Sequence, residues 1–247
     1  MLIVTERHTK ADLELWKDYE EIDELKINSY LDILEENAFR AMAVFSKNKN
    51  CYIGISWGKD SVVTADLALR NGLNFPLVHL NCIPSHNPGC DLVRDSFLKI
   101  YSTAQYYEII CDYRNVYALN LPDYLQDKET DKIWYQAWDK VGKEIAPCHI
   151  SGVRGEESTV RQIRMRRWGC NTERTCAPIG YWKNQQVFSY LFKYDLPVHP
   201  NYGMLGGGRW ERDRIRVAEI GDIHGNGGGR AEWEREYYPD ILAKIKK

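Results

Sequence analysis

The 247-residue sequence has little net charge and no long apolar run. Lys and Arg number 33 and Asp and Glu number 35, so the formal net charge at pH 7 is −2. No global field therefore draws the protein to nucleic acid or to an anionic membrane, and such binding would need a local basic patch. No apolar run reaches the roughly 20 residues that cross a bilayer, so we expect no membrane partner.

The chain also lacks the marks of an exported, disulfide-stabilised protein. Its first segment, MLIVTERHTKADLELWKDYEE, is too polar for a secretory signal. We therefore expect a cytoplasmic location. Seven cysteines in such a protein are more typical of free thiols, a metal site or a redox site than of a disulfide framework.

The hydrophobic pattern alternates between strands and helices. Short apolar, β-rich runs predict strands at 51–56, 75–80, 106–111 and 148–153. Helical patterns are found at 11–46, 61–71, 91–104, 131–145, 185–194 and 230–245. Such alternation predicts an α/β fold with a doubly wound, mostly parallel sheet, preceded by a long N-terminal helix and followed by an irregular C-terminal segment.

No convincing linker divides the chain, so we predict a single domain over 1–247. Within it we distinguish a helical N-terminal extension (1–48), a core (49–203), and a segment of Gly-rich loops with a C-terminal helix (204–247). Two parts of that last segment echo each other, GGGRW at 206–210 and GGGRAEW at 227–233. Flexible surface loops explain both, but their arginines could also order over an anionic ligand.

The sequence SWGKDS at 56–61 ends the first predicted strand and opens a helix. A helix N-terminus leaves backbone N–H groups unpaired and carries partial positive charge, and phosphate oxygens satisfy both. Gly58 lets the backbone approach a ligand closely. The hydroxyls of Ser56 and Ser61 can add hydrogen bonds, and Lys59 supplies a positive charge for phosphate.

Asp60 is the unexpected member, because a carboxylate beside phosphates is repulsive unless a cation lies between them. It therefore predicts Mg²⁺ bridging Asp60 and phosphate oxygens. The order of residues is not that of the Walker A loop. It resembles the S-G-G-x-D-S loop of the PP-loop ATP pyrophosphatases and their relatives, the PAPS reductase family, with Trp57 where a second glycine is expected. The alternative is that Ser56 and Asp60 only cap the helix.

A second matching segment begins at the end of the fourth predicted strand, where open α/β sheets bind ligands. Its pattern Gly152-x-Arg154-x-x-Glu157-Ser158-x-x-Arg161 resembles the G-x-R-x-x-E-S-x-x-R segment of the PAPS reductase family. Arg154 and Arg161 can offer bidentate forks to sulfate or phosphate. A solvated basic helix face would explain the later arginines, but not Arg154 at a strand end.

The third segment, at 176–202, is the most specific of the three. It resembles the family's run of a proline, a tryptophan, a helix and two further prolines before a tyrosine. The residues in register are Pro178, Trp182, Val187, Tyr190, Pro197, Pro200 and Tyr202. Most of them form scaffold, and Tyr202 is a modest ligand candidate.

The resemblance covers about residues 50–203 and implies an adenine nucleotide alpha hydrolase-like, Rossmann-like fold. An adenine nucleotide would lie across the carboxyl ends of the strands, with its base near His79, Leu80 and Asn81. At this place many relatives carry an Asp-Thr-Gly-like stretch that the chain lacks. The full set of nucleotide or phosphate contacts that we infer is Ser56, Trp57, Gly58, Lys59, Ser61, His79, Leu80, Asn81, Gly152, Arg154, Glu157 and Ser158. Lys59, Asp60, Arg154 and Arg161 are the candidates for catalysis.

Members of the family follow two chemistries. Some cleave ATP between the α and β phosphates and adenylate a substrate, whereas others reduce a sulfonucleotide such as PAPS or APS through a cysteine near the C-terminus. No cysteine follows Cys176 in this chain. We therefore expect ATP and Mg²⁺ as the ligands, with adenylyl transfer to an unknown acceptor and release of pyrophosphate. A sulfonucleotide reductase or a sulfurtransferase-type activity is the alternative.

Several residue types that bind metals cluster in the sequence. His79, Cys82, His86 and Cys90 are types that suit Zn²⁺, although their spacing is tighter than in common zinc motifs. Cys148, Cys170 and Cys176 could join Cys90 or another cysteine around an iron–sulfur cluster, which relatives acting in DNA phosphorothioation carry. Buried, idle thiols remain the simpler reading.

A basic run offers a different class of function. Five arginines are found between Arg161 and Arg174, namely Arg161, Arg164, Arg166, Arg167 and Arg174. They are enough for a phosphate-contacting patch, so the chain could be a DNA-modification subunit that acts on nucleic acid with partners. The residues leave open the identity of the acceptor and whether the chain forms a homo-oligomer.

Overall fold

The computed structural model describes residues 1–247 except 120, 218, 222–228 and 246–247. Its centre is a parallel sheet with strand order β3-β2-β1-β4-β5. The strands are β1 (Cys51–Gly54), β2 (Leu77–Ile83), β3 (Tyr106–Asp112), β4 (Cys148–Ile150) and β5 (Thr175–Cys176). The predicted α/β class and parallel sheet are confirmed, and β5 is an additional short strand.

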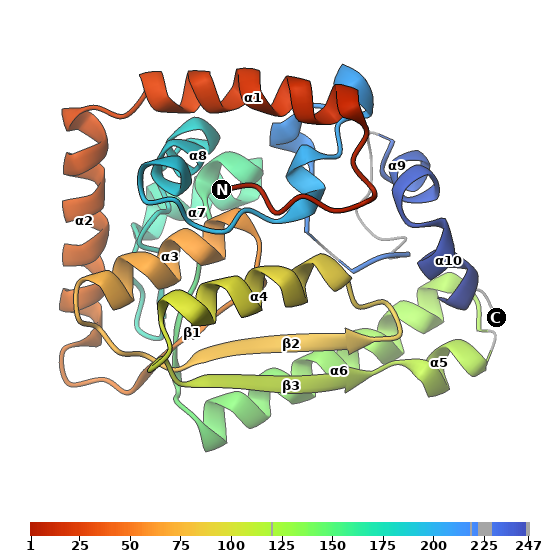
Figure 1. The fold of residues 1–247 in the computed structure, drawn as a ribbon. Coiled ribbons are helices and arrows are strands. Elements are labelled where there is room, and N and C mark those ends of the chain that lie inside the picture. The colour runs from red at the N-terminus through yellow and green to blue at the C-terminus, as the bar shows by residue number, and fades with distance from the viewer. Residues whose placement is uncertain (120, 218, 222–228, 246–247) are drawn as a thin grey trace.

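Helices cover both faces of the sheet, as Figure 1 shows. On one face lie α3 (Lys59–Arg70) and α4 (Pro88–Ile100), and on the other lies α6 (Asp123–Glu144). The alternation of strand side chains explains this arrangement: Ile53 packs into the main core with α3, whereas Tyr52 and Val78 pack against α6. Strands buried on both faces are apolar at nearly every position, which is why their pattern was readable.

The N-terminal helical region consists of two helices where we predicted a single long one. These are α1 (Lys10–Leu25) and α2 (Ser29–Ser46). Asn28 separates them, because its backbone is extended and its side chain accepts hydrogen bonds from the N–H groups of Tyr30 and Leu31. Trp16 and Leu31 belong to the same hydrophobic core as the sheet, so both helices pack onto it.

The remaining elements form the periphery. The other helices are α5 (Arg114–Ala118), α7 (Thr159–Trp168), α8 (Asn184–Lys193), α9 (Arg230–Tyr237) and α10 (Pro239–Ile245). The described residues also form 3₁₀ turns at η1 (Gly155–Glu157), η2 (Pro200–Gly203), η3 (Gly206–Gly208) and η4 (Arg212–Arg214). The helix predicted at 230–245 is interrupted before Pro239, which has no N–H to continue it. Within the described residues, no helix combines the length and the apolarity that crossing a membrane requires.

The first Gly-rich stretch lies in η3, where Gly206, Gly207 and Gly208 all have positive φ. An L-residue with a side chain rarely adopts that conformation, so this turn depends on glycine. The second stretch falls partly on 222–228, outside the described residues.

Candidate functional site

The strand order places the reversal of the sheet between β1 and β4. Open α/β sheets bind ligands at this switch point, beyond the carboxyl ends of the strands. A cavity of about 390 Å³ lies there, and we call it the switch-point cavity. Its walls come from the ends of β1 and β2, the start of α3, the segment after β4, and α6.

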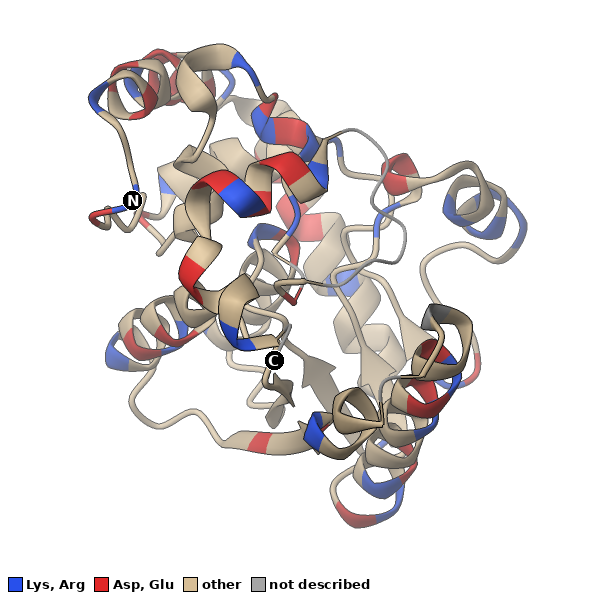
Figure 2. Ribbon diagram, turned by 90° about the vertical axis from the view of Figure 1, so that its right-hand side faces the viewer, with Lys and Arg blue, Asp and Glu red and all other residues tan. Residues whose placement is uncertain are grey.

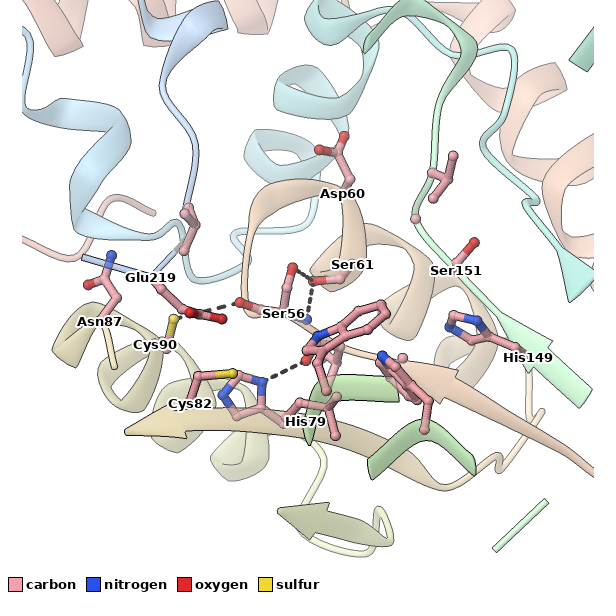
Figure 3. A pocket seen from close by; sticks show the side chains of 18 of the residues that line it. Ser56, Asp60, Ser61, His79, Cys82, Asn87, Cys90, His149, Ser151 and Glu219 are labelled. Carbon is pink, nitrogen blue, oxygen red and sulfur yellow. Dashed lines mark hydrogen bonds between the residues drawn. The ribbon is translucent and has the colours of Figure 1, made fainter. Parts of the chain in front are cut away.

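The loop at 56–61 forms part of this cavity and is held by its own serines. The Ser56 N–H donates to Ser61 Oγ at 3.2 Å, and the Ser61 hydroxyl donates to the Gly58 carbonyl at 2.9 Å. The two hydroxyl oxygens lie 3.2 Å apart, and a dashed line marks this contact in Figure 3. These bonds fix the turn from β1 into α3, and both serines line the cavity.

The first turn of α3 presents unpaired backbone donors. Gly58 is the N-cap and gives no side-chain hydrogen bond. The Lys59 N–H donates to Tyr202 Oη at 3.3 Å, whereas the N–H groups of Asp60 and Ser61 have no partner in the described part of the chain. Such donors at the positive end of a helix are suited to an anion.

Gly152 lies directly against this turn. A Cβ added at Gly152 would be 2.6 Å from the Asp60 carbonyl carbon and 2.8 Å from the Ser61 nitrogen. Side chains do not tolerate such distances, so only glycine lets the segment after β4 come this close to α3. The contact between the two motifs is therefore formed by backbone.

Trp57 has a buried side chain that points away from the cavity. Its indole is 1% exposed and packs on Phe97 and Tyr106, with ring centroids 5.9 and 5.6 Å away. Its φ is +61°, in the region that glycine favours. Trp57 thus keeps the backbone shape expected of the missing glycine, but Trp57, Gly58 and Lys59 are not among the residues that line this cavity.

Asp60 lies between two cations. Its Oδ2 is 2.8 Å from Lys59 Nζ and its Oδ1 is 2.6 Å from Arg154 Nε. The other nitrogens of Arg154 donate to Glu156, to the Trp182 carbonyl and to Asn184. The guanidinium is 3% exposed and lies outside the switch-point cavity. In this structure Arg154 is therefore bound to protein groups, and a role as a phosphate fork would require these bonds to open.

The Asp60 carboxylate is chemically suited to Mg²⁺. Each carboxylate oxygen has room for a second partner, and Mg²⁺ in nucleotide sites is typically held by one or two carboxylates plus phosphate oxygens and water. Asp60 lines the cavity beside the unpaired N–H groups of α3. The residues present therefore fit a magnesium ion that is held mainly by a phosphate ligand.

His79 faces the site in a defined protonation state. Its Nδ1 lies 2.9 Å from the Ile55 carbonyl, which only accepts, so Nδ1 carries the proton. Burial lowers the pKa of His79, which keeps the ring neutral and leaves Nε2 as an acceptor. Nε2 is buried without a partner in the described residues. Leu80 also lines the cavity, whereas Asn81 lies outside it and donates to Glu108.

Three aromatic residues that the sequence reasoning missed complete the opposite wall. They are Trp134 and Trp138 of α6 and His149 of β4. The His149 ring stacks on Tyr52 with centroids 4.9 Å apart, and burial lowers the pKa of His149 to about 4. The four-residue spacing of the two tryptophans places them on one helix face and was the available signal. Flat rings of this kind suit a base.

The Glu-Ser part of the second motif shapes the edge of the cavity. Glu157 accepts from the Arg154 N–H at 2.8 Å and pairs with the Arg161 guanidinium, and both Glu157 and Arg161 line the cavity. Ser158 lies outside it, where its Oγ accepts the Arg161 N–H at 3.2 Å and caps α7.

The other arginines of the basic run lie away from the cavity. Arg164, Arg166, Arg167 and Arg174 are exposed, and α7 carries basic but no acidic residues, as seen at the right of Figure 2. Elsewhere in this view, Lys and Arg are interspersed with Asp and Glu along the ribbon. Nucleic-acid binding through α7 stays a prediction.

The metal-binding residues do not assemble. Among the residues that the structure describes, no three His, Cys, Asp or Glu side chains gather closely enough to hold a metal ion. Of the zinc set, His79 bonds the Ile55 carbonyl, Cys82 the Tyr113 hydroxyl and Cys90 the Ser56 carbonyl, while His86 pairs with Asp91. Cys148, Cys170 and Cys176 are free thiols. Each of the four side chains in the zinc set therefore has a different local partner among the described residues, and the iron–sulfur set stays a prediction.

Comparisons with known proteins identify the family of the chain. The family model of the phosphoadenosine phosphosulfate reductase domain matches residues 50–224, which extends past the 203 inferred from the motifs. A comparison with curated protein sequences finds no match. Among solved structures, NMN synthetase from Francisella tularensis has a TM-score of 0.51 and 12% identity, covering 88% of this chain and 96% of that one.

Two further solved structures are similar at lower scores. PAPS reductase from Candida auris, in a phosphate complex, has a TM-score of 0.47 and 16% identity, covering 70% of this chain and 90% of that one. The U34-tRNA thiolase NcsA from Methanococcus maripaludis, with its 4Fe-4S cluster, has a TM-score of 0.46 and 12% identity. The match covers 95% of this chain and 78% of that one. The family match spans most of the sequence and includes all three motifs, so the chain belongs to the phosphoadenosine phosphosulfate reductase domain family.

Proposed function

We propose that the protein binds ATP with Mg²⁺ in the switch-point cavity and transfers AMP to an acceptor, releasing pyrophosphate. The observation that carries this proposal is the first turn of α3. It presents the unpaired N–H groups of Asp60 and Ser61 to a cavity at the reversal of the sheet, next to a lysine and a carboxylate. That combination suits a polyphosphate with a divalent cation.

The proposed orientation follows from the two ends of the cavity. The phosphates lie at the 56–61 loop, and the base lies toward Leu80 and the aromatic wall of α6. There His79 Nε2 is a buried acceptor without a partner. The exocyclic amino group of adenine is a donor and would satisfy it, whereas the carbonyl oxygen of guanine at the same place would repel it. The cavity chemistry therefore favours adenine.

The chemistry that we propose is electrostatic. An oxygen of the acceptor forms a bond to the α-phosphorus while the bond from that phosphorus to the bridging oxygen breaks, and pyrophosphate leaves with the electron pair. The loop N–H groups stabilise the charge that develops on the leaving group, and Lys59 adds a positive charge beside them, where it pairs with Asp60. Mg²⁺, when bound through Asp60 and phosphate oxygens, would neutralise further charge. No covalent intermediate with the protein is needed.

Reduction of a sulfonucleotide is less well supported by the site. It requires a reactive thiolate at the cavity. Cys82 and Cys90 line the cavity but are both buried. Burial raises the pKa of the Cys90 thiol, so the thiolate is disfavoured at neutral pH.

The products formed from α-labelled ATP test the proposal. We expect the label in AMP or in an adenylate, with one equivalent of unlabelled pyrophosphate, when candidate acceptors are supplied with Mg²⁺. Labelled ADP with free phosphate would contradict cleavage between the α and β phosphates. Omission of Mg²⁺ should abolish the reaction.

Replacement of the proposed magnesium ligand gives a second test. Asp60→Asn should weaken binding of ATP with Mg²⁺ at least tenfold, on the order of 1.4 kcal/mol, and should remove the difference between titrations with and without Mg²⁺. Asp139→Asn is the matched control, since that carboxylate lies on the exposed surface of α6. Calorimetric titration measures both. Unchanged magnesium dependence in Asp60→Asn would count against this role.

A further inference from the structure

A second cavity, of about 650 Å³, lies on the other side of Asp60, and we call it the C-terminal cavity. Lys59 and Arg154 line it, whereas Asp60, which pairs with both, lines the switch-point cavity. Glu157 lines both cavities. Asp60 and its two ion pairs therefore lie between the two adjacent cavities, and a reaction between ligands in the two would require these pairs to open.

Residues that follow the two glycine runs noted in the sequence line this cavity. Arg209 and Trp210 follow the first glycine run, Arg230 and Trp233 follow the second, and all four line it. Trp233 is buried and its Nε1 donates to the Met204 carbonyl at 2.8 Å. Trp210 packs against Tyr237, with ring centroids 5.8 Å apart. The aromatic part of the wall is thus fixed by packing and hydrogen bonding.

The lining of the C-terminal cavity carries more cations than carboxylates. The cations are Lys59, Arg154, Arg209, Arg214, Arg216 and Arg230, and the carboxylates are Glu156, Glu157, Glu211 and Asp213. Several of these groups neutralise each other, as in the 2.9 Å pair of Arg214 with Glu211. Arg216 is different, because its exposed guanidinium has no ion pair or hydrogen bond within the described residues. An anion entering the cavity would find this guanidinium available.

We propose that the C-terminal cavity binds the acceptor, and that the acceptor is a small molecule bearing a carboxylate or phosphate group. This inference rests on the proposed function, since it places ATP in the adjacent switch-point cavity. A carboxylate or phosphate oxygen is already anionic at neutral pH, so it can attack the α-phosphorus without giving up a proton. The new oxygen–phosphorus bond forms as pyrophosphate leaves, and no general base is required.

Fluorine NMR of the full chain labelled with 5-fluorotryptophan tests this proposal. The chain has 8 tryptophans, and each resonance can be assigned by its Trp→Phe variant. The probes are citrate, inorganic phosphate and, as an uncharged comparison, glycerol, all at constant ionic strength. We expect citrate or phosphate to shift the Trp210 resonance saturably and glycerol to leave it unchanged. The anion that binds more tightly distinguishes a carboxylate site from a phosphate site.

Arginine variants locate the binding. Arg216→Ala should weaken the anion about tenfold, the size of one lost charge-assisted hydrogen bond. Arg167→Ala is the matched control, because Arg167 is an exposed arginine of α7 that lines neither cavity. The absence of a saturable Trp210 shift with both anions, or equal losses in the two variants, would overturn the inference.

A titration with α,β-methylene-ATP and Mg²⁺ separates this inference from the proposed function. The analogue should shift the resonances of Trp134 and Trp138, which line the switch-point cavity. Shifts there without an anion response at Trp210 would contradict the acceptor site alone. An anion response at Trp210 without any effect of the analogue would support the anion site and contradict the proposed function.

Discussion

Residue 57 combines backbone strain with a large buried side chain. For residues other than glycine, the left-handed conformation costs roughly 1–2 kcal/mol. Trp57 adopts it at φ +61° and is 1% exposed. Burial of the indole against Phe97 and Tyr106 offsets that cost. The family loop can therefore accept tryptophan at a glycine position.

Two variants separate these contributions. Trp57→Ala loses the indole and keeps the strain, whereas Trp57→Gly loses the indole and the strain together. We expect both to be destabilised, with Trp57→Ala less stable than Trp57→Gly by about 1 kcal/mol. At ordinary positions the glycine variant is the less stable one, because glycine loses more backbone conformational entropy than alanine when the chain folds. Urea unfolding measures the difference, and an alanine variant as stable as the glycine variant would refute the account of strain.

Buried histidines should make the protein sensitive to acid. Burial lowers the pKa of His149 to about 4 and that of His199 to about 3. In the unfolded chain a histidine titrates near 6.5. Between these values the unfolded state binds more protons than the folded state, so stability is complete above about pH 6.5 and falls as the pH decreases. The expected slope is about 1.4 kcal/mol per pH unit for each histidine.

His149→Phe tests this linkage at one residue. Phenylalanine can keep the stacking on Tyr52 but cannot bind a proton. Between about pH 6.5 and 5, the free energy of unfolding of the variant should fall less steeply than that of the wild type. The difference in slope should approach the uptake of one proton on unfolding. Denaturant unfolding over this pH range measures the slope. Equal slopes would mean that His149 is not neutral in the folded state.

At the scale of elements, the sequence predicted the strands and helices whose own residues show a clear hydrophobic pattern. The strands and the helices that follow them were found because buried parallel strands are continuously apolar and amphipathic helices are periodic. The break between α1 and α2 was missed, although Asn28 is a good N-cap, because the apolar positions continue past it. The two-residue strand β5 is too short to carry a pattern.

The candidate site likewise has parts that the sequence predicted and parts that it did not. The loop at 56–61 and Gly152 could be identified from their motifs, since each depends on local backbone geometry. The aromatic wall from α6 could not be assigned, because its position depends on packing between segments far apart in the sequence. The partners of Arg154 were missed for the same reason, as Asn184 and the Trp182 carbonyl lie about 30 residues away in the chain.

The contact between the segment after β4 and α3 can be tested at Gly152. Gly152→Ala places a Cβ 2.6 Å from the Asp60 carbonyl carbon, so the first turn of α3 must move. We expect ATP to bind at least tenfold more weakly. Gly142→Ala is the control, because nothing lies within 4 Å of a Cβ there, and it should stabilise α6 by about 0.5–1 kcal/mol without affecting ATP. Equal ATP affinities in both variants would contradict this role of Gly152.

At the scale of the whole molecule, the N-terminal helices hold the C-terminal segment. Asp23 of α1 makes a bidentate ion pair with Arg212 of η4, at 2.6 and 2.9 Å. Both side chains are buried, and the Arg212 guanidinium also lies 3.8 Å from the centroid of the Phe188 ring of α8. Segments 189 residues apart in sequence are thus joined beside the C-terminal cavity.

Removal of one partner of this ion pair should be costly. Asp23→Ala leaves a buried guanidinium unpaired, and we expect a loss of about 3–5 kcal/mol in the free energy of unfolding. Glu14→Ala, at an exposed carboxylate of the same helix, should change stability by less than about 1 kcal/mol. Replacement of both Asp23 and Arg212 by leucine should recover part of the loss. Similar stabilities for Asp23→Ala and Glu14→Ala would contradict a structural role for the pair.

The central claim is that the switch-point cavity holds ATP with its phosphates on the first turn of α3. A crystal structure with Mg²⁺ and α,β-methylene-ATP measures this directly. We predict phosphate oxygens within hydrogen-bond distance of the Asp60 and Ser61 N–H groups, Mg²⁺ on Asp60, and the base between Leu80 and the α6 tryptophans. A nucleotide bound with its phosphates away from the 56–61 loop would contradict the account.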